Sequence, residues 1–498
     1  MKTTHFILAL STLALAACSG SHKPASHTLP VPELKPDYAG VTFAPNIAAP
    51  SFVIMAEADA EAWQTEIGRC GAEPAITVYS GCDGKVEIPL KRWQKLLGEA
   101  AGDSIYFRFA ARTGGEWNGA VADVVCPVSA TPIDGYLVYR LLYPGYELWS
   151  AIGIYERDLS NYSQRPILEN KDFDQQCINC HNFAANDPAR GMMVHVRGKQ
   201  GGTLISRNGE VEKINSNFMG ANHGATYPGW SRDGRFIAFS ANKVGQVFHS
   251  SGLKPIEVLD QSADLMVYNV ETRTAYSDSL LSGDDAIETF PNWSPDGRTL
   301  FFCRAVLSNP HLPETAPDSI HYDLCAIDFS PADGRFSNFR TLYDASAEEK
   351  SVAFPRCSPD GRWLMFTRMD YGTFSIWHPE SQLCLLDLST GQWREMDEVN
   401  SESIDSYHSW STDGRWFVFS SKRLDGLWAR PYIAAFDPAT GRAAKPFALP
   451  QKEAGFYDTF TRTFNIPELI SQPVVNVDAL LHGIVSQQPV DIRLVTPE

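Results

Sequence analysis

Four segments in the second half of the chain share one pattern, and this repeat limits the possible folds more than any other feature. Each begins with an aromatic residue, has Trp or Cys three positions later, and continues as Ser-x-Asp-Gly-Arg and an apolar run. The Trp or Cys positions are 230, 293, 357 and 410, so the repeats are spaced by 63, 64 and 53 residues. A fixed motif at variable spacing is typical of repeats that carry loop insertions.

The chemistry of the repeat predicts strands. Asp-Gly favours a two-residue hairpin turn, because glycine adopts a positive φ without steric cost. The apolar run after the Arg predicts a buried strand. Companion segments at 265–272, 383–391 and 432–441 supply a second hairpin for each repeat. Two hairpins make a four-stranded sheet, and such sheets bury both faces when they stack radially. We therefore expect an all-β protein with a β-propeller.

The segment Trp293-Ser-Pro-Asp-Gly-Arg298 resembles the WD40-like (PD40) repeat of TolB-type β-propellers, and the resemblance covers roughly residues 190–465. It implies the fold and says little about function. Residues 202–214 predict one more hairpin, and 457–469 a degenerate last strand that closes the ring. We expect five to seven blades, with six favoured, in a propeller over 199–498. Separate hairpins that do not close are the alternative, which leaves open edges.

The part before the repeats has a different pattern. Leu90, Trp93, Leu96 and Leu97 have helical spacing, and 105–110 and 136–142 resemble strands. We interpret 38–165 as a smaller, mostly β domain of sandwich type. The alternative is that it also supplies propeller strands.

The N-terminus predicts export. Lys2 precedes an apolar run from Phe6 to Ala17, which ends in Leu15-Ala-Ala-Cys18 and resembles a bacterial lipoprotein signal. The resemblance implies that 1–17 is removed and that Cys18 is acylated, while 18–37 forms a flexible tether. An ordinary secretory signal is the alternative. No later stretch is long and apolar enough to span a bilayer, so we expect attachment by lipid alone. Ser19 after Cys18 favours the outer membrane, facing the periplasm.

Charge and cysteine content bound the partners further. The 59 acidic residues exceed the 42 Lys and Arg, and the net charge of −17 argues against nucleic-acid binding. Of the ten cysteines, seven remain after Cys18 and the motif described next, so at least one is unpaired. We expect a disulfide between Cys70 and Cys82. Buried thiols are expected at Cys303, Cys325 and Cys384.

The sequence Cys177-Ile-Asn-Cys180-His181 matches Cys-x-x-Cys-His, the attachment motif of c-type haem. Two thiols form thioethers with the haem vinyl groups, and the adjacent His is the proximal iron ligand. At this composition the motif is expected by chance about 0.005 times. We place it in a connector, 166–198, between the two domains. A redox Cys-x-x-Cys or disulfide is the second interpretation. A structural metal site is the third, although no second Cys/His pair is close.

A distal haem ligand is available in Gly191-Met-Met-Val-His-Val-Arg197. On a strand, Met193 and His195 point to one face and Met192 to the other. Met193 and His195 are therefore the candidates, Met for a higher potential and His for a lower one. Strand packing for Met193 and a hydrogen-bonded role for His195 are the structural alternatives.

Other catalytic motifs are missing. The chain has no Gly-x-Ser-x-Gly, no phosphate-binding glycine loop and no His-Glu-x-x-His. The remaining histidines are scattered, and the repeated aspartates belong to turns. We expect haem c with a role in periplasmic electron transfer or redox or ligand sensing, the propeller docking a protein partner. The alternative is a binding module without haem, or, less favoured, a glycan-active enzyme that uses carboxylates of the central channel. Whether the protein is an enzyme stays open.

Overall fold

The computed structural model describes residues 26–55, 60–120, 122–143, 151–199, 201–216, 224–252, 254–307 and 317–495. The predicted signal peptide, the acylation site Cys18 and part of the tether lie outside these residues. The described helices include none that is long and apolar enough to cross a membrane.

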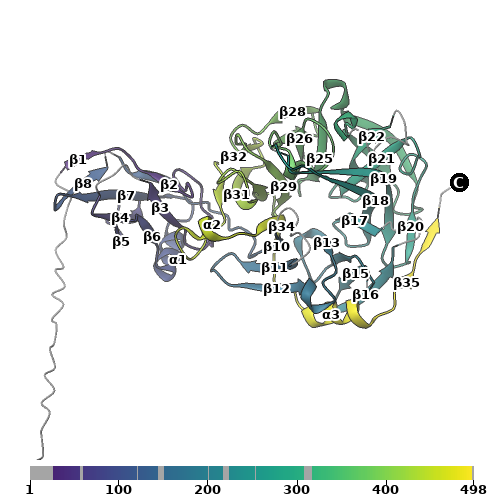
Figure 1. Cartoon of the computed structure of the whole chain (residues 1–498), viewed down its shortest axis with the longest axis horizontal. Helices are drawn as coiled ribbons and strands as arrows, with labels where there is room; N and C mark the ends of the chain where they lie inside the picture. The colour runs from purple at the N-terminus through teal and green to yellow at the C-terminus, as the bar shows by residue number, and fades with distance from the viewer. Residues whose placement is uncertain are drawn as a thin grey trace, which may run out of the picture.

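The front domain is mostly β, as predicted, and lies beside the propeller (Figure 1). Helix α1 buries Trp93, Leu96 and Leu97, as their spacing predicts. The elements of this domain are β1 (Ser26–Leu29), β2 (Glu33–Lys35), β3 (Ser51–Met55), β4 (Ala62–Arg69), β5 (Ile76–Gly81), β6 (Lys85–Glu87), α1 (Leu90–Glu99), β7 (Ser104–Thr113), β8 (Glu116–Ala120) and β9 (Val124–Pro127).

The front domain packs against the propeller through a shared core. The Phe43 and Phe447 rings lie 5.5 Å apart, and the Tyr38 hydroxyl donates to the Ala448 carbonyl over 3.1 Å. The predicted disulfide within the front domain is absent, because Cys70 and Cys82 are separate exposed thiols. They lie at opposite ends of the β4–β5 hairpin, which at the rise of a strand places them about 30 Å apart.

The propeller has six blades, the favoured number, since two of the eight sheets in the described chain belong to the front domain. The chain passes through each blade from its innermost strand outwards, except in blade 1. The first three blades are β34 (Thr463–Ile470), β10 (Tyr136–Leu142), β11 (Gly153–Asp158) and β12 (Gln164–Glu169); β13 (Ile178–Phe183), β14 (Met192–Val196), β15 (Gly202–Arg207) and β16 (Glu210–Asn215); and β17 (Gly224–Trp230), β18 (Phe236–Phe248), β19 (Ile256–Asn269) and β20 (Thr274–Tyr276).

The other three blades contain the last three repeats of the motif. Their strands are β21 (Ala286–Trp293), β22 (Thr299–Val306), β23 (Asp323–Phe329) and β24 (Phe336–Tyr343); β25 (Ser351–Cys357), β26 (Trp363–Met369), β27 (Gln382–Asp387) and β28 (Gln392–Glu395); and β29 (Asp405–Trp410), β30 (Trp416–Ser421), β31 (Arg430–Asp437), β32 (Arg442–Ala443) and β33 (Phe447–Ala448).

Blade 1 closes the ring and corrects the predicted domain boundaries. The late strand β34 pairs with β10, as the prediction of a closing strand within 457–469 requires. The propeller therefore begins at Tyr136 rather than at 199, and the predicted connector contains the two inner strands of blade 2. The short α2 (Phe456–Thr459) precedes β34. After it, α3 (Val477–Ser486) packs on blade 2, while β35 (Val490–Asp491) and β36 (Arg493–Val495) extend blades 2 and 3.

The Ser-x-Asp-Gly loops join the inner strand to the second strand in blades 3 to 6. In each, the Ser hydroxyl donates to the Asp carboxylate over 2.5 to 2.7 Å. The same carboxylate accepts from the backbone N–H of the following Arg over 3.0 to 3.1 Å. In blade 4 the backbone of Ser294 pairs with Thr299, so the loop holds the four residues 295–298 and not the two predicted. These aspartates have a structural role in the turns.

Each inner strand carries one residue with positive φ at a bulge, and these six residues form an axial ring around the propeller axis. They are Cys180, Tyr227, Phe290, Phe354, Tyr407 and Ile466, with φ between 48° and 54°. Neighbouring aromatic members contact each other, with ring centroids 4.0 to 4.7 Å apart. The ring thus fills the middle of the channel.

We expect Phe290→Ala to destabilise the protein by about 3–5 kcal/mol, because it leaves a cavity where all blades meet. Phe290 is fully buried and lies 4.0 Å from Phe354 and 4.4 Å from Tyr227, measured between ring centroids. Phe339→Ala on the outer strand β24 is the control, since Phe339 is 36% exposed, and should cost about 1 kcal/mol or less. Equal shifts of the urea midpoint for both variants would contradict a core at the axis.

Candidate functional site

A cavity of about 340 Å³ lies on the propeller axis, at the end where the inner strands begin. The axial-ring residues Tyr227, Tyr407 and Ile466 line it, and blades 1, 2, 3, 5 and 6 supply its walls. The Asp-Gly loops are at the opposite end, because they follow the inner strands. Much of the wall is apolar or aromatic, including Trp377, Phe374 and Val258. A pocket of this size and composition suits a small molecule or a cofactor.

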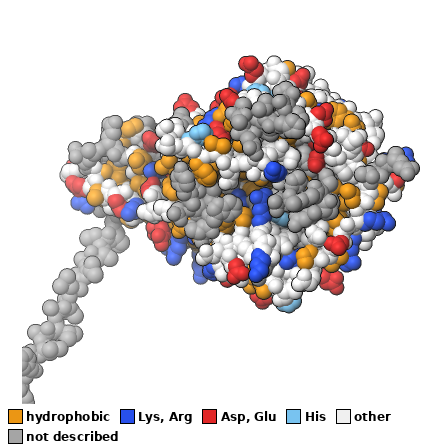
Figure 2. Space-filling model, turned by 45° about the vertical axis from the view of Figure 1, so that its right-hand side comes forward, with side chains coloured by type: hydrophobic (Ala, Val, Ile, Leu, Met, Phe, Trp, Pro, Cys, Tyr) orange, Lys and Arg blue, Asp and Glu red, His pale blue; other side chains and the backbone are white. Residues whose placement is uncertain are grey.

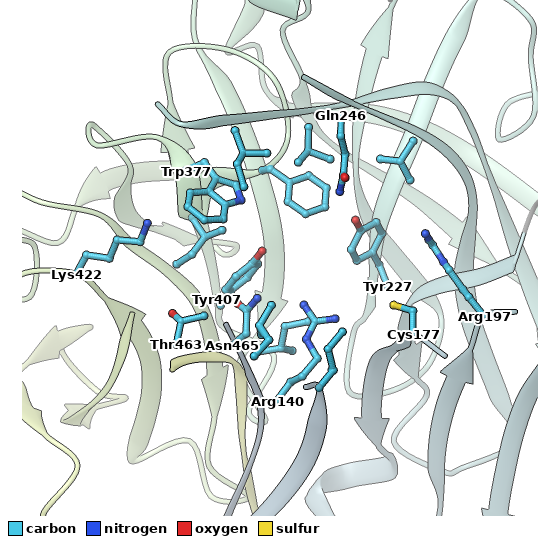
Figure 3. A pocket seen from close by; sticks show the side chains of 18 of the residues that line it. Arg140, Cys177, Arg197, Tyr227, Gln246, Trp377, Tyr407, Lys422, Thr463 and Asn465 are labelled. Carbon is cyan, nitrogen blue, oxygen red and sulfur yellow. The ribbon is translucent and has the colours of Figure 1, made fainter. Parts of the chain in front are cut away.

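Three cations point into this cavity from three blades (Figure 3). They are Arg140 on β10, Arg197 after β14, and Lys422 after β30. Among the described residues that line the cavity there is no aspartate or glutamate. The contrast with the whole chain is large, because its net charge is −17, and Figure 2 shows acidic side chains, in red, at many places on the surface. The cavity therefore favours an anionic ligand with an apolar body.

Lys422 has an unusual environment for a lysine. Its side chain is buried, and Nζ lies 4.2 Å from the centroid of the Trp377 ring, a cation–π distance. Burial lowers the pKa of Lys422 to about 8, with the Asp425 charge opposing the shift. The ammonium group thus lies against an aromatic face, and no carboxylate among the described residues accepts a hydrogen bond from it.

The two cysteines of the predicted haem motif lie at different depths. Cys177, just before β13, is half-buried and lines the cavity. Cys180 belongs to the axial ring, and its Sγ accepts a hydrogen bond from the Tyr227 backbone N–H over 3.4 Å. The structure does not join the two thiols to each other. Burial raises the pKa of both thiols. This argues against a redox Cys-x-x-Cys, which needs a reactive thiolate.

The His181 side chain is buried, and its two ring nitrogens lack hydrogen-bond partners among the described residues. The residue is 2% exposed, and within the described residues neither ring nitrogen has a hydrogen-bond partner of normal geometry. Burial, together with the charge of Arg140, lowers the pKa of His181 to about 3, and the Ile466 backbone opposes this shift weakly. A neutral imidazole with free nitrogens is the form that binds a metal, and an unpaired buried polar group is otherwise costly.

Cys180 and His181 also occupy positions that recur in every blade. Cys180 takes the place of the aromatic residue that begins each repeat, and His181 takes the place that His408 has in blade 6. His408 Nε2 lies 3.0 Å from the Met365 carbonyl oxygen, so its partner is the preceding blade. The Cys-His half of the motif is therefore compatible with a purely structural origin. Cys177 lies outside the repeated pattern.

The structure does not place Met193 and His195 on the face of blade 2 that carries His181. On the β13–β14 pair, His181 is opposite Val194, whereas Asn182 is opposite Met193 and Asn179 is opposite His195. Opposite residues share a face, so both distal candidates are on the other face of blade 2. Met193 packs in the core towards blade 3, and His195 Nδ1 is 3.0 Å from Thr203 Oγ1. These placements correct the prediction of either residue as a distal ligand.

A structural metal site has no geometric support, since no cluster of three or more His, Cys, Asp or Glu that suits a metal occurs in the described chain. The buried thiols Cys303, Cys325 and Cys384 are confirmed. The sequence does not predict the cavity cations, because no local motif marks Arg140, Arg197 or Lys422. One signal was available: two repeats begin with Tyr and two with Phe, and only the tyrosines Tyr227 and Tyr407 line the cavity.

No protein-family model matches the chain, and neither does any curated protein sequence. Solved structures resemble it in fold. A putative 6-phosphogluconolactonase from Bacteroides uniformis is 10% identical, covers 79% of this chain and 98% of its own, and has a TM-score of 0.33. The periplasmic gluconolactonase of Pseudomonas aeruginosa is 16% identical, covers 66% of this chain and 99% of its own, and has a TM-score of 0.31. An oligogalacturonate lyase from Vibrio parahaemolyticus is 10% identical, covers 63% of this chain and 86% of its own, and has a TM-score of 0.31. These similarities concern the propeller fold alone.

The buried Lys422 predicts a pH dependence of stability. Between pH about 8 and 10.5 the unfolded chain holds a proton that the folded protein has lost, so Lys422 makes the free energy of unfolding rise with pH across this range. We expect Lys422→Met to lack this contribution, a difference of roughly 1–3 kcal/mol from the unchanged protein. Urea unfolding at pH 7, 8, 9 and 10 measures it. The exposed Lys243→Met is the control, and curves for Lys422→Met parallel to those of the unchanged protein would contradict the prediction.

Proposed function

We propose that the cavity holds a c-type haem attached to Cys177 and Cys180, with His181 as an axial ligand of the iron. The protein would then act in electron transfer, or in redox or ligand sensing, in the cell envelope. The observation that carries this proposal is that a Cys-x-x-Cys-His motif opens through Cys177 onto a cavity with three cations and no described acidic lining residue. Haem is an apolar macrocycle with two carboxylates, which matches such a cavity.

The residues of the chain fit this group in their chemistry. Cys177 lines the cavity, whereas Cys180 and His181 lie outside its lining; together they would supply two sulfur atoms and a nitrogen donor. Arg140, Arg197 and Lys422 suit carboxylates, and the apolar wall excludes water. When bound, haem supplies one-electron chemistry. Burial of its surroundings and the positive charges beside it would raise its reduction potential.

The location and the partner belong to the same proposal. The lipoprotein signal at Cys18 would anchor the chain to the outer membrane, facing the periplasm, and the propeller, TolB-like in its repeats, would dock a protein partner. No nucleic acid is expected. A binding module without haem is the second candidate, because Cys180 and His181 stand at positions that every blade uses. The described cavity lining, which has no carboxylate, does not favour the glycan-active enzyme.

We expect covalent haem when the full chain is produced with a c-type cytochrome maturation system. Intact-mass analysis should show one haem added, and the protein should stain for haem after denaturation. Cys177→Ala should lose the second thioether and most of the stain. Cys70→Ser is the control, since Cys70 is an exposed thiol of the front domain. A matured chain with no added mass would overturn the proposal and leave the binding module.

The repeat supplies a matched pair of histidines. His181→Gln should change the Soret band and the reduction potential of the haem protein, because an axial ligand is replaced. His408→Gln alters the equivalent position of blade 6, where the partner is the Met365 carbonyl. It should lower the thermal midpoint and leave the spectrum unchanged. Identical spectra for His181→Gln and the unchanged haem protein would rule out His181 as a ligand.

A further inference from the structure

The middle hairpin of blade 3 is much longer than its counterparts. Strands β18 and β19 have 13 and 14 residues, whereas β22 and β23 of blade 4 have 8 and 7. The inner part, which ends near Lys243, belongs to the blade, and the register shifts between Lys243 and Val244. We call residues 244–252 and 254–260 the strap. In Figure 1, β18 and β19 extend from blade 3 across the ring towards β25 and β29.

The strap forms part of the cavity wall. Val244 and Gln246 of β18, and Ile256 and Val258 of β19, line the cavity opposite residues of blades 1, 5 and 6. None of these four belongs to a hydrophobic core cluster of the described residues, whereas Phe236, Ala238, Leu265 and Val267 of the inner part do. The strap therefore buries Ile256 and Val258 at the cavity wall, outside the core clusters that hold its own blade.

The far end of the strap is fastened to blade 5 by a polar cluster, the latch. Lys254 Nζ lies 3.1 Å from Glu380 Oε1 and 3.2 Å from His378 Nδ1, and it lies 4.1 Å from the centroid of the Tyr371 ring. Glu257 accepts a hydrogen bond of 2.7 Å from the Tyr371 hydroxyl. These contacts join residues 114 to 126 positions apart and pass over blade 4.

The latch holds the strap closed only while its charged and polar groups remain paired. Its groups are partly withdrawn from water, with His378 2% and Glu257 6% exposed, so they stabilise the closed strap only while each has its partner. Loss of one partner leaves the others buried and unpaired, which favours release. A hairpin held by such contacts, and not by a core, opens at lower cost than the blade from which it extends.

We propose that the strap is a gate over the axial cavity and that the Lys254–Glu257–Tyr371–His378–Glu380 latch controls access to it. A ligand reaches Cys177 and the three cations when the latch opens, and it is enclosed when the latch closes. The proposal depends on the cavity and not on haem, so it applies to any anionic ligand of the site.

The test uses the full chain made without haem attachment, with Cys177 as the probe. N-ethylmaleimide labelling is followed by peptide mass spectrometry, and the exposed Cys70 serves as an internal reference. Lys254→Met, alone and with Glu257→Gln, should speed labelling of Cys177 by about tenfold or more, because charged hydrogen bonds of the closed state are lost. The rate at Cys70 should not change. Lys243→Met is the matched control on the same hairpin and should label as the unchanged chain does.

Labelling of Cys177 at the unchanged rate in a folded Lys254→Met/Glu257→Gln chain would overturn the gate. Hydrogen exchange of the unchanged chain gives a second measurement that needs no variant. Amides of 256–260 should exchange faster than those of 263–269 on the same strand, since only the latter lie in the blade. Equal protection of the two segments would also overturn the proposal. Absence of haem in matured protein would leave both measurements valid.

Discussion

The pairing of β34 with β10 is the constraint on which the rest of the molecule depends. It joins a strand from the end of the chain to strands that precede the first repeat, over six matched residue pairs. Without this pair, β10 would have an unpaired edge, and blades 2 and 6 would lose their packing against β34. The axial ring and the cavity exist only in the closed ring, because each blade contributes one ring residue and five blades contribute cavity wall. The axial ring and the cavity therefore both depend on the long-range pairing of β34 with β10.

The axial ring explains why one sequence motif has two interpretations. Every inner strand needs a bulge with a positive φ and a side chain on the axis, and five blades fill this place with Tyr, Phe or Ile. Blade 2 uses Cys180. A cysteine there satisfies the packing and also presents sulfur just below a cavity that Cys177 lines. The need for an axial side chain at the bulge accounts for Cys180, but it does not account for Cys177, which lies before the strand. The case for haem therefore rests most on Cys177 and the cavity charges.

The repeat made much of the fold predictable, and its decay explains the errors. Asp296 and Gly297 mark a loop because their chemistry is local, so blades 3 to 6 were visible in the sequence. Blade 2 has lost the Asp-Gly loop, although Phe183 and His181 still match Trp410 and His408. That match is the signal in the sequence that indicates an inner strand for the motif. Blade 1 has no repeat signature, so the sequence pattern places β10 and β11 in the front domain and predicts only β34 as a propeller strand. The cavity was unpredictable because Arg140, Arg197 and Lys422 meet only after closure.

The same closure explains how an acidic protein maintains a positive cavity. Solvent screens surface charges within about 10 Å at moderate salt, so the acidic exterior does little to compensate for cations on the axis. Inside, the low polarity of the wall strengthens their field, and the Trp377 face stabilises Lys422 without neutralising it. The strap contributes to this effect, because Val244, Ile256 and Val258 supply apolar wall. The charges that favour an anion therefore come from blades 1, 2 and 6, whereas the proposed control of access belongs to the long hairpin of blade 3.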